Sequence, residues 1–218
     1  MIMKVIIACS SLQDYVDAAQ SRAGTNHPVI YLNQLYHRDP DEMRGHIREA
    51  FQKLPEGADT VLIAMGYCGG SWEGISASQT LVIPKIDDCI SILLQTGDSV
   101  ISNLKQPDHL YVRDKKPESF KGIFERMTAR VDAAAKARYH KDWQKLYNMM
   151  TIIDTGINDC RSDAYKSAVQ EDADWLEAGL EYVNGGTHLV EKLFRGHWDE
   201  QFLVLQPGET VRREDVLV

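Results

Sequence analysis

The chain has 218 residues, of which 44% are apolar and 26% charged, a balance that excludes collagen-like, disordered and membrane-spanning proteins. Its formal net charge of −8 works against binding nucleic acid across the whole surface. No uncharged apolar run approaches the roughly 18 residues of a spanning helix, and the run before Cys9 is too short for a signal peptide. We therefore expect a cytoplasmic protein that binds neither membrane nor nucleic acid.

Short apolar runs alternate with helical patterns along the chain, as in a parallel sheet covered on both faces. We expect strands at residues 4–8, 28–32, 60–65, 80–84, 150–154, 180–183 and 201–205. We expect helices at residues 11–22, 40–54, 87–94, 117–150 (one helix or two), 163–179 and 188–195. Asp39 and Pro40 form a typical helix start, because Asp can cap and Pro is tolerated in the first turn. The alternation predicts an α/β fold with a doubly wound, Rossmann-like parallel sheet.

A basic segment separates two stretches of this alternation. Residues 115–145 contain nine Lys or Arg and four Asp or Glu, a local net charge of +5 within an acidic chain. Such a segment can be a solvated helix face, or it can bind an acidic partner, a carboxylate-bearing cofactor or the acidic segment that follows it. We expect an α/β lobe at residues 1–114, a basic connecting segment at 115–149 and a second α/β lobe at 150–218.

Four cysteines, at positions 9, 68, 89 and 160, are too widely spread for a secreted disulfide framework. In open α/β sheets ligands bind outside the carboxyl ends of the strands. Cys9, Cys68 and Cys89 follow the first, third and fourth expected strands, and His37 follows the second. The sequence therefore delivers four candidate metal ligands to one edge of one sheet, while Cys160 falls in the other lobe.

The chemistry of these cysteines has three interpretations. A metal site is favoured because Cys89 opens an expected helix, whose positive N-terminal end should lower a thiol pKa and favour the thiolate that metals bind. Against a metal site, the chain has no CxxC pair, and free cysteines are common in cores as small apolar residues. A catalytic or redox thiol is the third interpretation.

Glycines surround Cys68 in the segment Gly66-Tyr67-Cys68-Gly69-Gly70, and they would let the backbone turn sharply and approach a bound group. We take Gly66, Tyr67, Gly69 and Gly70 as candidate cofactor-binding residues. The segment is not a phosphate-binding GxxxxGK[ST] loop.

Other polar residues sit at expected strand ends. Asp88 and His37 are candidates for general acid or base beside the cysteines, although Asp88 can equally cap a helix. Asp154 and Gly156 follow the first strand of the second lobe and are also candidates for ligand binding. They can instead form a turn in which Asp accepts backbone N–H groups and Gly takes positive φ.

Several segments together resemble one known family. They are residues 8–9, 35–40, 66–69 and 81–89, together with the closing stretch 185–209. In order and content they resemble the DUF1638 family, a domain of unknown function found largely in archaea and anaerobic bacteria. The resemblance includes Cys9, His37, Cys68 and Cys89 and leaves out Cys160. Family members often carry His where this chain has Asp87, and a different loop where it has residues 112–116.

The resemblance implies a role in anaerobic one-carbon metabolism, because some members are encoded near corrinoid-dependent methyltransferases. We expect a metal-binding enzyme that acts on a small-molecule substrate, with Cys9, Cys68 and Cys89 as thiolate ligands and His37 as fourth ligand or base. Zinc with one open position suits group transfer, such as methyl transfer to or from a thiol. A [4Fe–4S] cluster with a free iron suits a lyase. The rival is a non-catalytic accessory protein that binds a corrinoid or a methyltransferase through the basic segment.

Overall fold

A computed structural model describes residues 3–115 and 118–217, which form two compact units. Unit 1 comprises Met1–Leu104 with Thr187–Val218, and unit 2 comprises Lys105–Gly186. Unit 2 is thus inserted into unit 1, and the chain returns to unit 1 at Thr187. The expected division at residues 114 and 149 differs from this arrangement, because strand–helix alternation along the chain does not reveal which sheet each strand joins.

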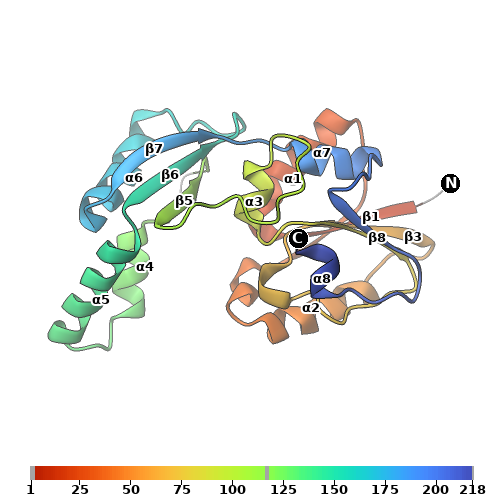
Figure 1. Ribbon diagram of the computed structural model, residues 1–218, viewed down its shortest axis with the longest axis horizontal. Coiled ribbons are helices and arrows are strands. Elements are labelled where there is room, and N and C mark those ends of the chain that lie inside the picture. Colours follow the sequence, from red (N-terminus) through yellow and green to blue (C-terminus); the bar gives the residue numbers. More distant parts are fainter. Residues whose placement is uncertain (1–2, 116–117, 218) are drawn as a thin grey trace. The chain divides into compact units, whose positions relative to one another are not determined.

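Unit 1 has a Rossmann-like α/β fold built on a mostly parallel sheet (Figure 1). Its strands are β1 (Met3–Cys9), β2 (Val29–Leu32), β3 (Ala58–Ala64), β4 (Thr80–Pro84) and β8 (Phe202–Leu205), in the spatial order β2-β1-β3-β4-β8. The first four are parallel, and β8 runs antiparallel to β4. The sequence analysis expected the last strand, β8, in a second lobe. In the structure it instead forms an edge of the unit 1 sheet, because pairing with β8 gives β4 a second neighbour.

Helices cover both faces of this sheet (Figure 1). They are α1 (Gln13–Ala23), α2 (Pro40–Gln52), α3 (Cys89–Leu94), α7 (His188–Arg195) and α8 (Arg213–Val216), with short 3₁₀ turns η1 (Ser10–Leu12), η2 (Gln34–Arg38) and η3 (Cys68–Gly70). α1, α3 and α7 lie on one face, and α2 and α8 on the other. α2 begins as expected, with the Asp39 carboxylate accepting the N–H groups of Asp41 and Glu42.

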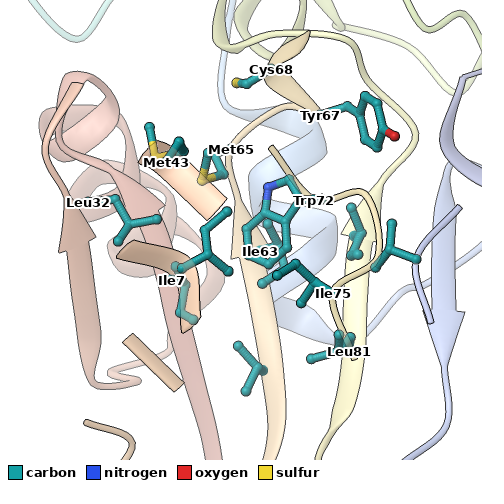
Figure 2. Packing of buried hydrophobic residues seen from close by; sticks show 14 of the residues in the cluster. Ile7, Leu32, Met43, Ile63, Met65, Tyr67, Cys68, Trp72, Ile75 and Leu81 are labelled. Atoms are coloured by element: carbon teal, nitrogen blue, oxygen red, sulfur yellow. The ribbon is translucent and has the colours of Figure 1, made fainter. Parts of the chain in front are cut away.

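The core under α2 is continuous with the loops after the strands. Trp72 and Ile75, from the segment between β3 and β4, are buried against Ile7, Ile63 and other strand residues (Figure 2). Figure 2 also shows Cys68 beyond one end of this group of side chains, and Cys9 and Cys68 both belong to the same buried cluster. Two of the candidate ligands, Cys9 and Cys68, therefore lie in the buried core of unit 1.

Unit 2 has a parallel three-stranded sheet of its own, in the order β5-β6-β7. The strands are β5 (His109–Arg113), β6 (Met149–Asp154) and β7 (Gly179–Asn184), and the helices are α4 (Phe120–Met127), α5 (Ala133–Leu146) and α6 (Asp163–Leu176). The basic segment forms two helices, α4 and α5, and its expected start at Pro117 lies outside the described residues. In the part of the chain that the structure describes, no helix combines the length and apolar character needed to cross a membrane.

A buried carboxylate joins two helices of unit 2. Asp172 of α6 is 2% exposed and accepts the N–H groups of Phe120 at 2.6 Å and Lys121 at 3.0 Å, together with the Ser119 hydroxyl at 2.9 Å. These donors belong to the first turn of α4, which has no carbonyl partners of its own for them. Asp172 therefore fixes the start of α4 against α6.

We expect Asp172→Ala to lower the free energy of unfolding of unit 2 by about 3 kcal/mol, because buried donors lose a charged acceptor. Chemical denaturation followed by tryptophan fluorescence measures the change, since Trp143 and Trp175 both pack in this unit. Asp142→Ala, at a carboxylate that is 67% exposed on α5, is the control and should change stability by less than about 0.5 kcal/mol. Equal effects of the two substitutions would contradict the role given to Asp172.

Candidate functional site

Three adjacent strands bring Cys9, Cys68 and Cys89 to one edge of the unit 1 sheet. β1, β3 and β4 are consecutive and parallel, so their carboxyl ends meet. Cys9 is the last residue of β1, Cys68 begins η3 after β3, and Cys89 begins α3 after β4. Cys9 and Cys68 are buried, and Cys89 is partly buried. The sequence prediction that these positions share one sheet edge agrees with this placement.

The loops after β3 and β4 run directly against each other. The backbone N–H of Tyr67 donates to the carbonyl of Ile86 at 2.8 Å, and that of Cys68 donates to Asp87 at 2.6 Å. A Cβ on Gly66 would lie 2.4 Å from the Cα of Asp88, so only glycine fits there. The close approach places Cys68 beside Cys89.

The turn that carries Cys68 has an unusual backbone. Cys68 has φ of +53°, and Gly69 and Gly70 follow with φ of +67° and +100°. Glycine adopts this left-handed region freely, but a residue with a Cβ does so at an energetic cost. The Cys68 carbonyl accepts a hydrogen bond from the Ser71 hydroxyl at 2.8 Å, and this bond helps to hold the turn. Such conformations cluster at functional sites, where surrounding structure enforces them.

The three thiols form a connected group with Cys89 in the middle. The Cys89 thiol interacts with the thiols of both Cys9 and Cys68 and with the backbone of Gly66. The Cys9 sulfur also lies 3.1 Å from the Ser11 hydroxyl. The contact with Cys89 and burial raise the pKa of Cys9 well above its usual range. The contact with Cys68 and burial do the same for the pKa of Cys89.

The raised pKa of Cys89 corrects one expectation. A helix start was expected to lower this pKa, but α3 has only six residues, and the neighbouring Cys68 thiol and burial outweigh its dipole. With no cation present, the thiols of Cys9 and Cys89 are therefore neutral near pH 7.

Comparison with known proteins identifies the family. A family model described as "Protein of unknown function (DUF1638)" matches residues 31–194. The chain belongs to the DUF1638 family. The match spans most of the chain, includes residues of both units and contains Cys68 and Cys89, whereas Cys9 precedes it. No curated protein and no solved structure matches the chain.

The other candidate residues in unit 1 of this DUF1638 chain differ in their exposure and in the groups that they contact. His37 is exposed on η2, and it is not among the groups that shift the pKa of Cys9 or Cys89. Asp88 caps α3, its carboxylate accepting the N–H of Ser91 at 2.8 Å. The Tyr67 hydroxyl donates to Glu73, and burial together with this carboxylate raises the Tyr67 pKa. Gly69 lies next to Pro40 at the start of α2, since a Cβ there would be 3.6 Å from the proline ring.

Some contributors have no recognisable sequence signal. Arg44 of α2 donates to the carbonyl of Gly70 at 2.8 Å and so ties the Cys68 turn to α2. Its Nε is buried and has no hydrogen-bond partner in the described residues. Ser11 and Glu73 contact Cys9 and Tyr67 respectively. These residues are ordinary surface types in the sequence, and only the fold brings them to the site.

Asp154 and Gly156 belong to unit 2. The Gly156 N–H donates to the Asp154 carboxylate at 3.3 Å, and Gly156 has φ of +68°, which are the features of a turn. Asp154 also pairs with Arg161 at 2.9 Å, and this guanidinium lies over the Tyr182 ring. Burial and the adjacent Asp154 raise the pKa of Cys160 to about 11. The hydrogen-bonding and charged groups of these residues therefore pair with one another.

The donor set of the thiol group is suited to a soft metal, but its arrangement is not that of a finished metal site. Among residues 3–115 and 118–217, no group of three or more His, Cys, Asp or Glu side chains is arranged to hold a metal ion. The thiols instead interact with each other. Metal binding at this position would require the side chains to turn towards a common point.

We expect Gly66→Ala to separate the two loops, because the added Cβ would overlap the Asp88 backbone. The substitution should lower the free energy of unfolding by about 3 kcal/mol and make Cys68 and Cys89 react faster with a thiol reagent. Gly45→Ala is the matched control: a Cβ there meets nothing within 4 Å, and alanine favours a helix interior by up to about 1 kcal/mol. Unchanged thiol reactivity in Gly66→Ala would show that the close approach does not position the cysteines.

Proposed function

We propose that this DUF1638 protein binds a thiophilic metal ion, zinc in the first instance, through Cys9, Cys68 and Cys89 and uses it in group transfer on a small-molecule substrate. The observation that supports this most directly is the connected thiol group, with Cys89 in contact with both other cysteines. Buried core thiols have no need to gather at a strand-end edge or to occupy a strained backbone. The positive φ of Cys68 adds independent support.

The interaction of Cys89 with both other thiols supports a single ion rather than a cluster. Thiolates on one tetrahedral zinc, each about 2.3 Å from it, lie about 3.8 Å apart, which is close enough for direct sulfur–sulfur contact. An iron–sulfur cluster holds each cysteine on a different iron and needs wider spacing. Three protein ligands would leave one position for substrate.

A bound zinc ion supplies activation of a thiol or water as nucleophile. The chain's own contribution is to hold the cysteines at the strand ends and to fix the Cys68 turn through Arg44 and Ser71. The more specific proposal, methyl transfer to or from a thiol, is supported by the family resemblance. The position of Asp88 as a helix cap beside Cys89 supports a positioning role for it in the site.

We expect the wild-type chain, purified without oxygen, to bind one zinc per chain, and Cys89→Ser to lose it. A serine hydroxyl near neutral pH is a far weaker ligand than a thiolate. Cys160→Ser is the matched control, because Cys160 is also a free cysteine but lies in unit 2. Elemental analysis of folded, monodisperse protein measures the difference, and equal metal content in both variants would remove Cys89 from the site. A broad visible absorption with bound iron would identify a [4Fe–4S] cluster instead.

We also expect zinc binding to release two or more protons near pH 7, because the raised pKa values of Cys9 and Cys89 keep these thiols protonated beforehand. The apparent affinity should therefore rise with pH in this range, since a higher pH removes the competing protons. Calorimetric titration in buffers of different ionisation enthalpy counts the protons. Binding that is independent of both buffer and pH would exclude the thiols as ligands.

An accessory role through the basic helices is the second candidate. α4 and α5 contain three of the large apolar side chains that stay exposed, namely Met127, Tyr139 and Leu146. Basic side chains beside exposed apolar ones suit docking on an acidic protein such as a corrinoid-bearing methyltransferase. If this is the function, reversing Arg138, Lys141 and Lys145 to Glu should abolish binding to that partner, while the Cys89→Ser variant binds normally.

A further inference from the structure

A groove of about 520 Å³ runs beside β7 in unit 2. One wall is a stripe of exposed side chains on α6, formed by Lys166, Ser167, Gln170, Glu171 and Asp174. β7 contributes Leu180 and Tyr182. All these residues belong to unit 2, whereas Cys9, Cys68 and Cys89 belong to unit 1.

The strand beside this groove is an edge. In the sheet order β5-β6-β7, the described part of β7 pairs with β6 alone. The other side of an edge strand presents backbone N–H and C=O groups that can pair with a further strand. The groove therefore combines an open strand edge with a polar helical wall.

We propose that this groove is a self-association surface, filled by β7 and α6 of a second copy of the chain around a two-fold axis. Antiparallel pairing of two β7 strands would join the two sheets into one, with strands about 4.8 Å apart. α6 connects β6 to β7, and its buried face shares a core with residues of both strands. A helix over the gap between β6 and β7 lies about one strand spacing from the two-fold axis, so the two copies of α6 would lie about 10 Å apart. That is the distance at which helices pack, and the second α6 would close the open side of the groove.

Under this symmetry, the charges of the α6 stripe on one copy are complementary to those on the other copy. Lys166 and Asp174 each lie four residues from Gln170, on opposite sides of it. A two-fold axis passing by Gln170 places Lys166 of each copy opposite Asp174 of the other, as a symmetric contact requires. Within one helix these two residues are about 12 Å apart along the axis, so they cannot pair inside one chain.

The test is sedimentation velocity of the full chain over a concentration series, with charge-reversed variants. The wild-type chain should form a dimer, and Lys166→Asp or Asp174→Lys alone should raise its dissociation constant at least about tenfold, because each creates two like-charge contacts. The double variant Lys166→Asp/Asp174→Lys should recover the wild-type dissociation constant. Lys53→Asp, at an exposed residue of unit 1 that follows α2, changes net charge as much as Lys166→Asp and should leave the dimer unchanged.

Two results would overturn the assignment. One is a chain that stays monomeric at every concentration. The other is a dimer that the single reversals do not weaken, or that the double variant does not restore. Circular dichroism of each variant separates loss of association from loss of folding. Metal binding at the cysteines plays no part in this test, so its outcome is independent of the function proposed for them.

Discussion

The close approach of the backbones at Gly66 and Asp88 is the constraint on which the candidate site depends. With no side chain at Gly66, the loops after β3 and β4 can hydrogen bond directly, Tyr67 to Ile86 and Cys68 to Asp87. These bonds place Cys68 in a left-handed conformation, and they put the first residue of α3 next to it. Burial of Trp72 and Ile75 in the same segment stabilises an arrangement that local backbone preference opposes.

The electrostatics of the thiol group follow from that geometry. Burial disfavours a thiolate, and a second thiolate beside the first is disfavoured further, so Cys9 and Cys89 hold their protons. A cation at the same place would supply the charge that makes several thiolates compatible. Cys160 differs because its neighbour is the Asp154 carboxylate, which already pairs with Arg161, so nothing there requires an additional charge.

The two units use their strand ends differently. In unit 1 the carboxyl ends of three strands carry the cysteines, whereas in unit 2 the corresponding loops are connected by internal hydrogen bonds. Asp114, after β5, is buried and accepts the backbone N–H groups of Thr155 and Asn158, which fixes the loop after β6. Among the described residues of unit 2, β7 pairs with β6 on one side and leaves its other side as a sheet edge. The metal binding proposed above belongs to unit 1, and the self-association proposed above belongs to unit 2.

Local patterns in the sequence determined most of the elements of this protein. Apolar runs predicted every described strand except β5, the Asp39–Pro40 pair predicted the start of α2, and the placement of Cys9, Cys68 and Cys89 after parallel strands predicted that they share a sheet edge. These features depend on neighbouring residues and on the general rule for strand ends. Tertiary structure alone decided the return of β8 to β4, the contacts of Arg44 and Ser11, and the raised pKa of Cys89. These depend on which distant segments become neighbours, and burial and charge at a residue are set by those neighbours rather than by its position in the chain.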